Sequence, residues 1–153
     1  MNGLVVLDVA AVRENDQLWY VAHPVHPTDA DVAALREAEK RAASWFPRKT
    51  ERALKEIVIR DNIENAKRWL AWLIRRYPPI TFVAPWIASL DGGGDDDLDP
   101  AQRARGLRDC RRTIERCDGM VHVGGRISDG MTQEAKVAKL VADLTFLGRC
   151  PPA

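Results

Sequence analysis

Residues 118–134 read DGMVHVGGRISDGMTQE, and this stretch decides the expected fold. The apolar residues within 120–123 are typical of a buried parallel strand, and the glycine pair 124–125 ends the run. A helix can begin directly afterwards, because Ser128 or Asp129 is a good cap for its first turn. The stretch therefore predicts a strand, a glycine-rich turn and the start of a helix.

The same turn is suited to an anionic ligand. A helix start offers unpaired N–H groups, Gly130 lets a ligand approach the backbone, and Glu134 follows within about the first turn. An acidic residue near a helix start is also common for dipole reasons alone, and Arg126 could equally be an exposed loop arginine. The candidate ligand-binding residues of this stretch are Gly125, Arg126, Ser128, Asp129 and Gly130.

The composition is that of a single globular domain. The chain has 153 residues, 46% of them hydrophobic, and a formal net charge of +1, which does not favour a nucleic-acid polymer as partner. Three cysteines without CxxC spacing argue against a disulfide framework and a zinc site, and favour a reducing cytoplasm. The apolar run 4–12 contains Asp8 and lacks a basic start, so neither a signal peptide nor a membrane span is expected.

Strands and helices alternate along the chain outside the deciding stretch. Expected strands cover 4–12, 18–25, 80–84 and 141–147, and expected helices cover 62–77 and 100–117. The segment 27–60 has the composition of an inserted pair of helices, and it could serve as a lid or an oligomer contact. The acidic stretch 89–100 has the composition of a loop, and its spacing does not fit a calcium site.

Such alternation predicts an α/β fold, a Rossmann-like or flavodoxin-like parallel sheet with helices on both faces. Ligands of these sheets bind beyond the carboxyl ends of the strands. In this chain those ends are marked by His23 and Pro24, by Trp86, and by the turn that leads to Glu134. His23 could bind a ligand there or serve only as a capping or surface residue.

Three segments together resemble the nucleoside 2-deoxyribosyltransferase superfamily, which includes N-hydrolases of nucleoside 5′-monophosphates. YVAHP at 20–24 looks like the family's first-strand ligand loop, CDGMV at 117–121 like its strand that enters the site, and SDGMTQE at 128–134 like its S-x-G-x-x-x-E catalytic turn. The resemblance spans about 19–147, with 27–60 outside it. It implies a homo-oligomer that needs no cofactor or metal.

The resemblance also implies roles for individual residues. Glu134 matches the catalytic carboxylate, Ser128 the phosphate-binding serine of the monophosphate hydrolases, and Gly130 the glycine against which the ligand packs. The family's usual Asp on the helix before the central strand aligns with Cys110, and Asp109 is one residue away.

The expected reaction is cleavage of an N-glycosidic bond through an oxocarbenium-like transition state. Glu134 would stabilise or attack C1′, and Asp109, Asp118 or Asp129 would protonate the departing base. With water as acceptor the protein is a hydrolase, and with a second base it is a deoxyribosyltransferase. The rival hypotheses are a non-catalytic nucleotide-binding module and an interaction protein that uses Trp45, Trp69 and Trp72 as its surface.

Overall fold

The computed structural model describes residues 17–42, 45–92 and 94–153. The expected strand at 4–12 lies outside these ranges. Within them the chain forms a four-stranded parallel sheet of order β2-β1-β3-β4, made of β1 (Gln17–Ala22), β2 (Ile80–Val83), β3 (Gly119–His122) and β4 (Val141–Asp143). The α/β fold with a parallel, Rossmann-like or flavodoxin-like sheet is thus confirmed.

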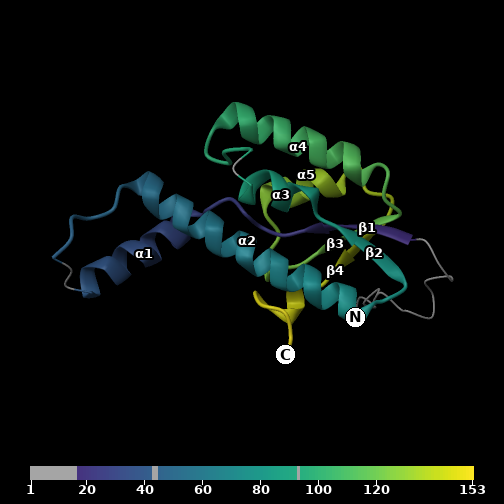
Figure 1. Cartoon of the computed structure of the whole chain (residues 1–153), viewed down its shortest axis with the longest axis horizontal. Coiled ribbons are helices and arrows are strands. Elements are labelled where there is room, and N and C mark those ends of the chain that lie inside the picture. The colour runs from purple at the N-terminus through teal and green to yellow at the C-terminus, as the bar shows by residue number, and fades with distance from the viewer. Residues whose placement is uncertain (1–16, 43–44, 93) are drawn as a thin grey trace.

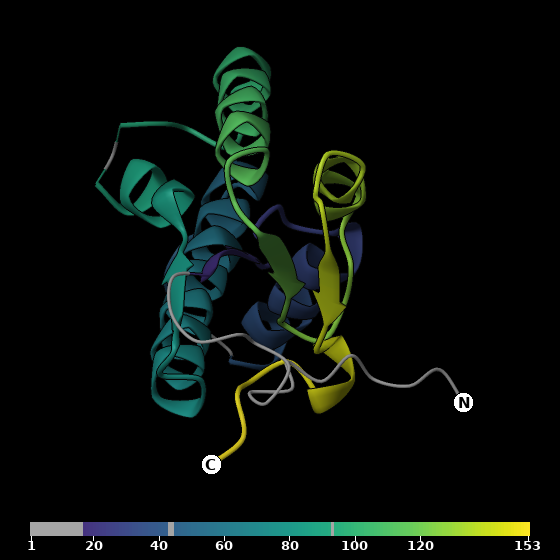
Figure 2. The same cartoon turned by 90° about the vertical axis from the view of Figure 1, so that its right-hand side faces the viewer.

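Helices cover both faces of this sheet (Figures 1 and 2). On one face, α2 (Glu51–Arg76) packs Trp69 and Leu73 against Val21 and Val121. On the other face, α4 (Pro100–Ile114) and α5 (Asp129–Ala135) enclose a second cluster that contains Tyr20. Successive side chains of β1 and β3 point to opposite faces of the sheet, so both strands contribute to both clusters, as expected for strands buried on both faces.

The helix expected at 62–77 begins earlier than the sequence predicts. It is part of α2, one continuous helix that begins at Glu51 with Thr50 as its cap, so the expected start at residue 62 is wrong. Buried residues continue at helical spacing from Leu54 through this region, and Asn62 uses its side-chain amide to donate to the Val25 carbonyl at 2.9 Å. The preceding helix α1 (Asp29–Arg41) packs beside α2, has no buried residue and projects from the body (Figure 1).

Other boundaries differ from the sequence-based expectations for local reasons. The chain leaves β1 after Ala22 and reaches Pro24, which has no N–H to donate. A short helix α3 (Pro85–Asp91) starts on Pro85 and extends into the stretch 89–100, where a loop was expected. The last strand stops at Asp143, because its carboxylate accepts bonds from the backbone and hydroxyl of Thr145 and starts a 3₁₀ turn, η1 (Thr145–Leu147).

The strand order places the topological switch point between β1 and β3, whose connections leave to opposite sides. In open α/β sheets this is where ligands bind. The loop after β3 contains Gly124 and Gly125, both with positive φ, so the turn predicted from the glycine pair is present. None of the helices in the described ranges is both long and apolar enough to span a bilayer.

Candidate active site

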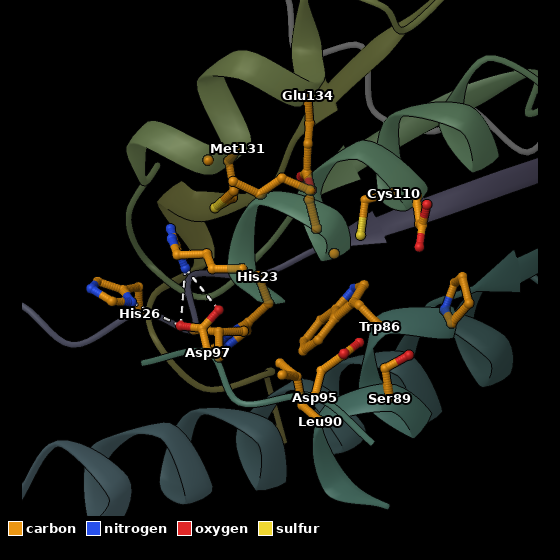
Figure 3. A pocket seen from close by; sticks show the side chains of 18 of the residues that line it. His23, His26, Trp86, Ser89, Leu90, Asp95, Asp97, Cys110, Met131 and Glu134 are labelled. Carbon is orange, nitrogen blue, oxygen red and sulfur yellow. Dashed lines mark hydrogen bonds and ion pairs between the residues drawn. The ribbon is translucent and has the colours of Figure 1, made fainter. Parts of the chain in front are cut away.

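A pocket of about 150 Å³ opens at the carboxyl end of β1, beside the start of α5, the helix that follows β3 (Figure 3). Its walls come from β1 and the loop after it, from α3 and the acidic loop 95–97, from α4, and from the start of α5. The sequence-predicted residues that line it are His23, Trp86, Asp109, Ser128, Gly130 and Glu134.

The Glu134 carboxyl group reaches into this pocket from the second turn of α5, on the side opposite Trp86 and Leu90 (Figure 3). Its side chain belongs to the buried polar residues, with 7% exposure. Burial raises the pKa of Glu134 to about 7, while a hydrogen bond from Tyr20 and the charge of Arg103 act in the opposite direction. The group therefore changes charge near neutral pH, as carboxyls in acid–base and nucleophilic chemistry commonly do.

Tyr20 and Cys110 flank Glu134 inside the pocket. Burial, followed by the nearby Glu134 charge, raises the pKa of the Tyr20 hydroxyl well above its usual value. Burial likewise raises the pKa of the Cys110 thiol to about 12. Both groups are therefore protonated at neutral pH and can donate to the carboxylate, which fixes the orientation of Glu134.

The α4 residues that face the pocket follow a helical stripe composed of Arg103, Gly106, Leu107 and Cys110. Asp109 lies at the edge of this stripe, and its carboxylate is 57% exposed and 3.4 Å from Arg108 Nε. The position that the family resemblance assigns to an acid is therefore occupied by the Cys110 thiol. Asp109 remains at the rim of the pocket.

Three consecutive aspartates of the loop before α4 are each paired with a cation. Asp95 pairs with Arg105, Asp96 with Arg52 of α2, and Asp97 with Arg103. Asp97 also lies 2.8 Å from His26 Nδ1, so it connects the loop after β1 to α4. Ion pairs therefore hold the acidic loop against the pocket. The loop that the composition predicts is present, but its aspartates are paired with cations.

His23 is buried as a neutral residue, neither on the surface nor at a cap. Its Nδ1–H donates to the Pro24 carbonyl at 2.8 Å, and its Nε2 accepts from the Asn65 amide at 2.8 Å. Burial lowers the pKa of His23 to about 4, against the opposing effect of the Pro24 bond. Since both ring nitrogens have partners, His23 contributes to the pocket wall without a nitrogen available for proton transfer.

Ser128 caps α5, as the sequence predicts, by accepting from the Met131 N–H at 3.3 Å. Gly130 presents bare backbone to the pocket, and Trp86 is held by a bond from its indole N–H to the Val21 carbonyl at 2.9 Å. These residues line the pocket together with Glu134, His23 and Asp109.

The fold does not place the remaining candidates in the pocket wall. Asp118 precedes β3 at the amino end of the sheet, where it accepts from the Leu18 N–H at 2.7 Å, so it cannot protonate a base held at the carboxyl end. Arg126 donates to the His26 carbonyl at 3.2 Å. Gly125 packs against the Arg149 backbone, and Pro24 and Asp129 also lie outside the lining residues.

Sequence reasoning missed Tyr20, Arg103, His26 and Asp97. A signal existed for Arg103, which falls on the same helical stripe as Cys110, and for Tyr20, which shares a sheet face with Ala22. Among the described residues, no cluster of three or more His, Cys, Asp or Glu side chains is close enough to hold a metal ion.

No protein-family model matches the chain, and no curated protein or solved structure matches it either. The resemblance to nucleoside 2-deoxyribosyltransferases therefore stays a prediction.

Proposed function

We propose that this protein cleaves the N-glycosidic bond of a nucleoside 5′-monophosphate, as a ribohydrolase or deoxyribohydrolase, with Glu134 as the attacking carboxylate. The observation that carries the proposal is the buried Glu134, which enters the pocket between the Tyr20 hydroxyl and the Cys110 thiol. Carboxylates held in this manner stabilise developing positive charge at a sugar C1′ more strongly than water does.

In the proposed reaction, an oxygen of Glu134 bonds to C1′ while the C1′–N bond breaks and its electron pair leaves with the base. The base takes a proton from Asp109 at the rim or from water, because the other candidate acids lie outside the pocket wall. Water then hydrolyses the glycosyl ester and restores the carboxylate. A second base in place of this water would make the protein a deoxyribosyltransferase.

The second candidate function is non-catalytic nucleotide binding. The charge pairing at the pocket mouth favours it: Asp95, Asp96 and Asp97 all hold cations, and Asp109 is largely exposed. None of these four carboxyls is both buried and unpaired. A binding module would use Ser128 and the pocket wall for the nucleotide, and Glu134 only to hold Tyr20 in place.

The deciding experiment is the release of free base from a panel of nucleoside 5′-monophosphates, followed by chromatography. We expect the wild-type protein to release base. The rate of release by Glu134→Gln should be lower by about 100-fold or more, the loss typical of removing one electrostatic stabiliser. The exposed Glu115, at the end of α4 and away from the pocket, provides the matched control Glu115→Gln, which should keep full activity. Full activity in Glu134→Gln would refute the assignment, and binding without release would favour the module.

A further inference from the structure

The pocket contains a cation that the sequence pattern did not identify. Arg103 comes from the first turn of α4, and its side chain is about a quarter exposed. One nitrogen of its guanidinium group, Nη1, donates to both Asp97 oxygens at 2.8 and 2.9 Å. Asp97 is in turn held by His26 at 2.8 Å, so the guanidinium is fixed from one edge.

The other edge of this guanidinium faces Gly130. A Cβ atom placed on Gly130 would lie 3.7 Å from Arg103 Nη2 and 3.8 Å from Ser128 Oγ. Leu107 Cδ2 would be nearer still, at 3.4 Å, so these two polar groups and one methyl group border a small space that Gly130, which has no side chain, leaves open. A tetrahedral anion in this space could accept from the guanidinium and from the serine hydroxyl together, in the geometry that arginine provides for phosphates.

From this juxtaposition, we infer that Arg103 supplies the cation of the 5′-phosphate subsite that the resemblance implies at Ser128. This inference rests on the proposed function for the identity of the ligand. Arg126, the cation that the sequence suggested, is directed elsewhere: it donates to the His26 carbonyl and lies 4.0 Å from Asp31. The role of Asp97 is to position Arg103.

The charges around the pocket are compatible with a bound anion. The three aspartates of the neighbouring loop are neutralised by Arg52, Arg103 and Arg105. Arg103 acts on Glu134 as well, since its positive charge lowers the pKa of that carboxyl. Since Arg103, Ser128 and Glu134 line the same pocket, the phosphate subsite and the reacting carboxylate can act on one ligand.

The test is equilibrium binding by calorimetry in a Glu134→Gln background, so that no ligand is consumed. The probes are inorganic phosphate, nucleoside 5′-monophosphates and the matching nucleosides. Arg103→Ala should weaken monophosphate binding about tenfold or more, the usual loss for a hydrogen bond to a charged group, and leave nucleoside binding nearly unchanged. Ser128→Ala should show the same selectivity, and Arg103→Lys should be intermediate because a lysine cannot bridge Asp97 and the ligand.

Two further variants make the test specific. Arg112→Ala removes an exposed cation from the same helix outside the pocket and should leave phosphate binding unchanged. If Arg126→Ala abolishes the preference for the monophosphate while Arg103→Ala keeps it, or if the wild-type protein binds no phosphate compound, the inference is overturned. Phosphate binding that depends on Arg103, without any base release by the wild-type protein, supports this inference and contradicts only the proposed function.

Discussion

At the scale of single residues, two buried titratable groups of the pocket have opposite effects on stability. Burial raises the pKa of Glu134 from 4.5 to about 7 and lowers that of His23 from 6.5 to about 4. Between pH 4.5 and 7 the folded protein therefore holds an extra proton on Glu134, whereas between pH 4 and 6.5 it lacks one on His23. As the pH rises, the first group lowers the free energy of unfolding and the second raises it.

Replacing Glu134 should therefore change the pH dependence of stability. Glu134→Gln removes the cost of ionising a buried carboxyl, so we expect its stability relative to wild type to increase from pH 4.5 to 7.5, by about 3 kcal/mol at most. The variant should keep the stabilisation from neutral His23 as the pH rises. Urea unfolding of both proteins at several pH values measures the difference. A difference that does not change with pH would mean that the Glu134 carboxyl is not buried as an acid.

At the scale of elements, α2 connects β1 with the carboxyl-terminal tail. The Asn65 amide donates both to His23 Nε2 and to the Arg149 carbonyl at 2.7 Å, and the Trp69 indole donates to the same carbonyl at 2.7 Å. The backbone of Arg149 in turn supports Gly125, so the tail helps to hold the loop before α5. A helix on the far face of the sheet thereby stabilises the loop that precedes the candidate site.

Removing the Asn65 side chain should destabilise the whole protein. Asn65→Ala leaves His23 Nε2 buried without a donor and removes the bond to Arg149, which should cost about 2–3 kcal/mol. Glu64→Ala, on the exposed side of the same helix, breaks only a surface ion pair with Lys67 and should cost less than about 1 kcal/mol. Chemical unfolding measures both. Equal losses of stability in the two variants would show that the buried hydrogen bonds of Asn65 do not stabilise the protein.

At the scale of the whole molecule, the tryptophans do not form one surface. Trp69 is completely buried and Trp72 packs against the core, with their rings 5.5 Å apart, whereas Trp45 is fully exposed beyond α1. The apolar side chains of α2 are therefore largely buried within one chain. Of the three tryptophans, Trp45 is therefore the one that is available for an interface. Self-association can also use other exposed apolar residues. These are Phe46, Ile74, Ile127, Leu140 and Phe146.

We still expect at least a dimer. Exposed apolar side chains such as Phe146, with 56% exposure, gain from burial against a second copy, and the resembled family consists mainly of homo-oligomers. Sedimentation at micromolar concentration provides the measurement. A single species at the chain mass of 17.1 kDa would contradict the expectation. The variant Phe146→Ser tests whether this region takes part, since it should shift a dimer toward the monomer without unfolding it.

The sequence by itself determined the features whose causes are local. The apolar run of β3, the positive-φ glycines after it and the Ser128 cap depend on residues a few positions apart, and they are present as predicted. The same local signals fail where tertiary contacts compete with them. Asn62 is a residue type that favours helix caps, yet it lies inside α2, where its side-chain amide donates to the Val25 carbonyl.

Only the tertiary structure decided which side chains meet at the site. Every buried parallel strand has a similar apolar pattern, so the order β2-β1-β3-β4 is not encoded in any one of them. That order brings His26 to Asp97 across 71 residues of sequence, and Asp97 in turn accepts from the nearby Arg103. The choice between Asp109 and Cys110 has a related cause: one residue turns a helix by about 100°, so packing of α4 on the sheet decides which side chain faces Glu134.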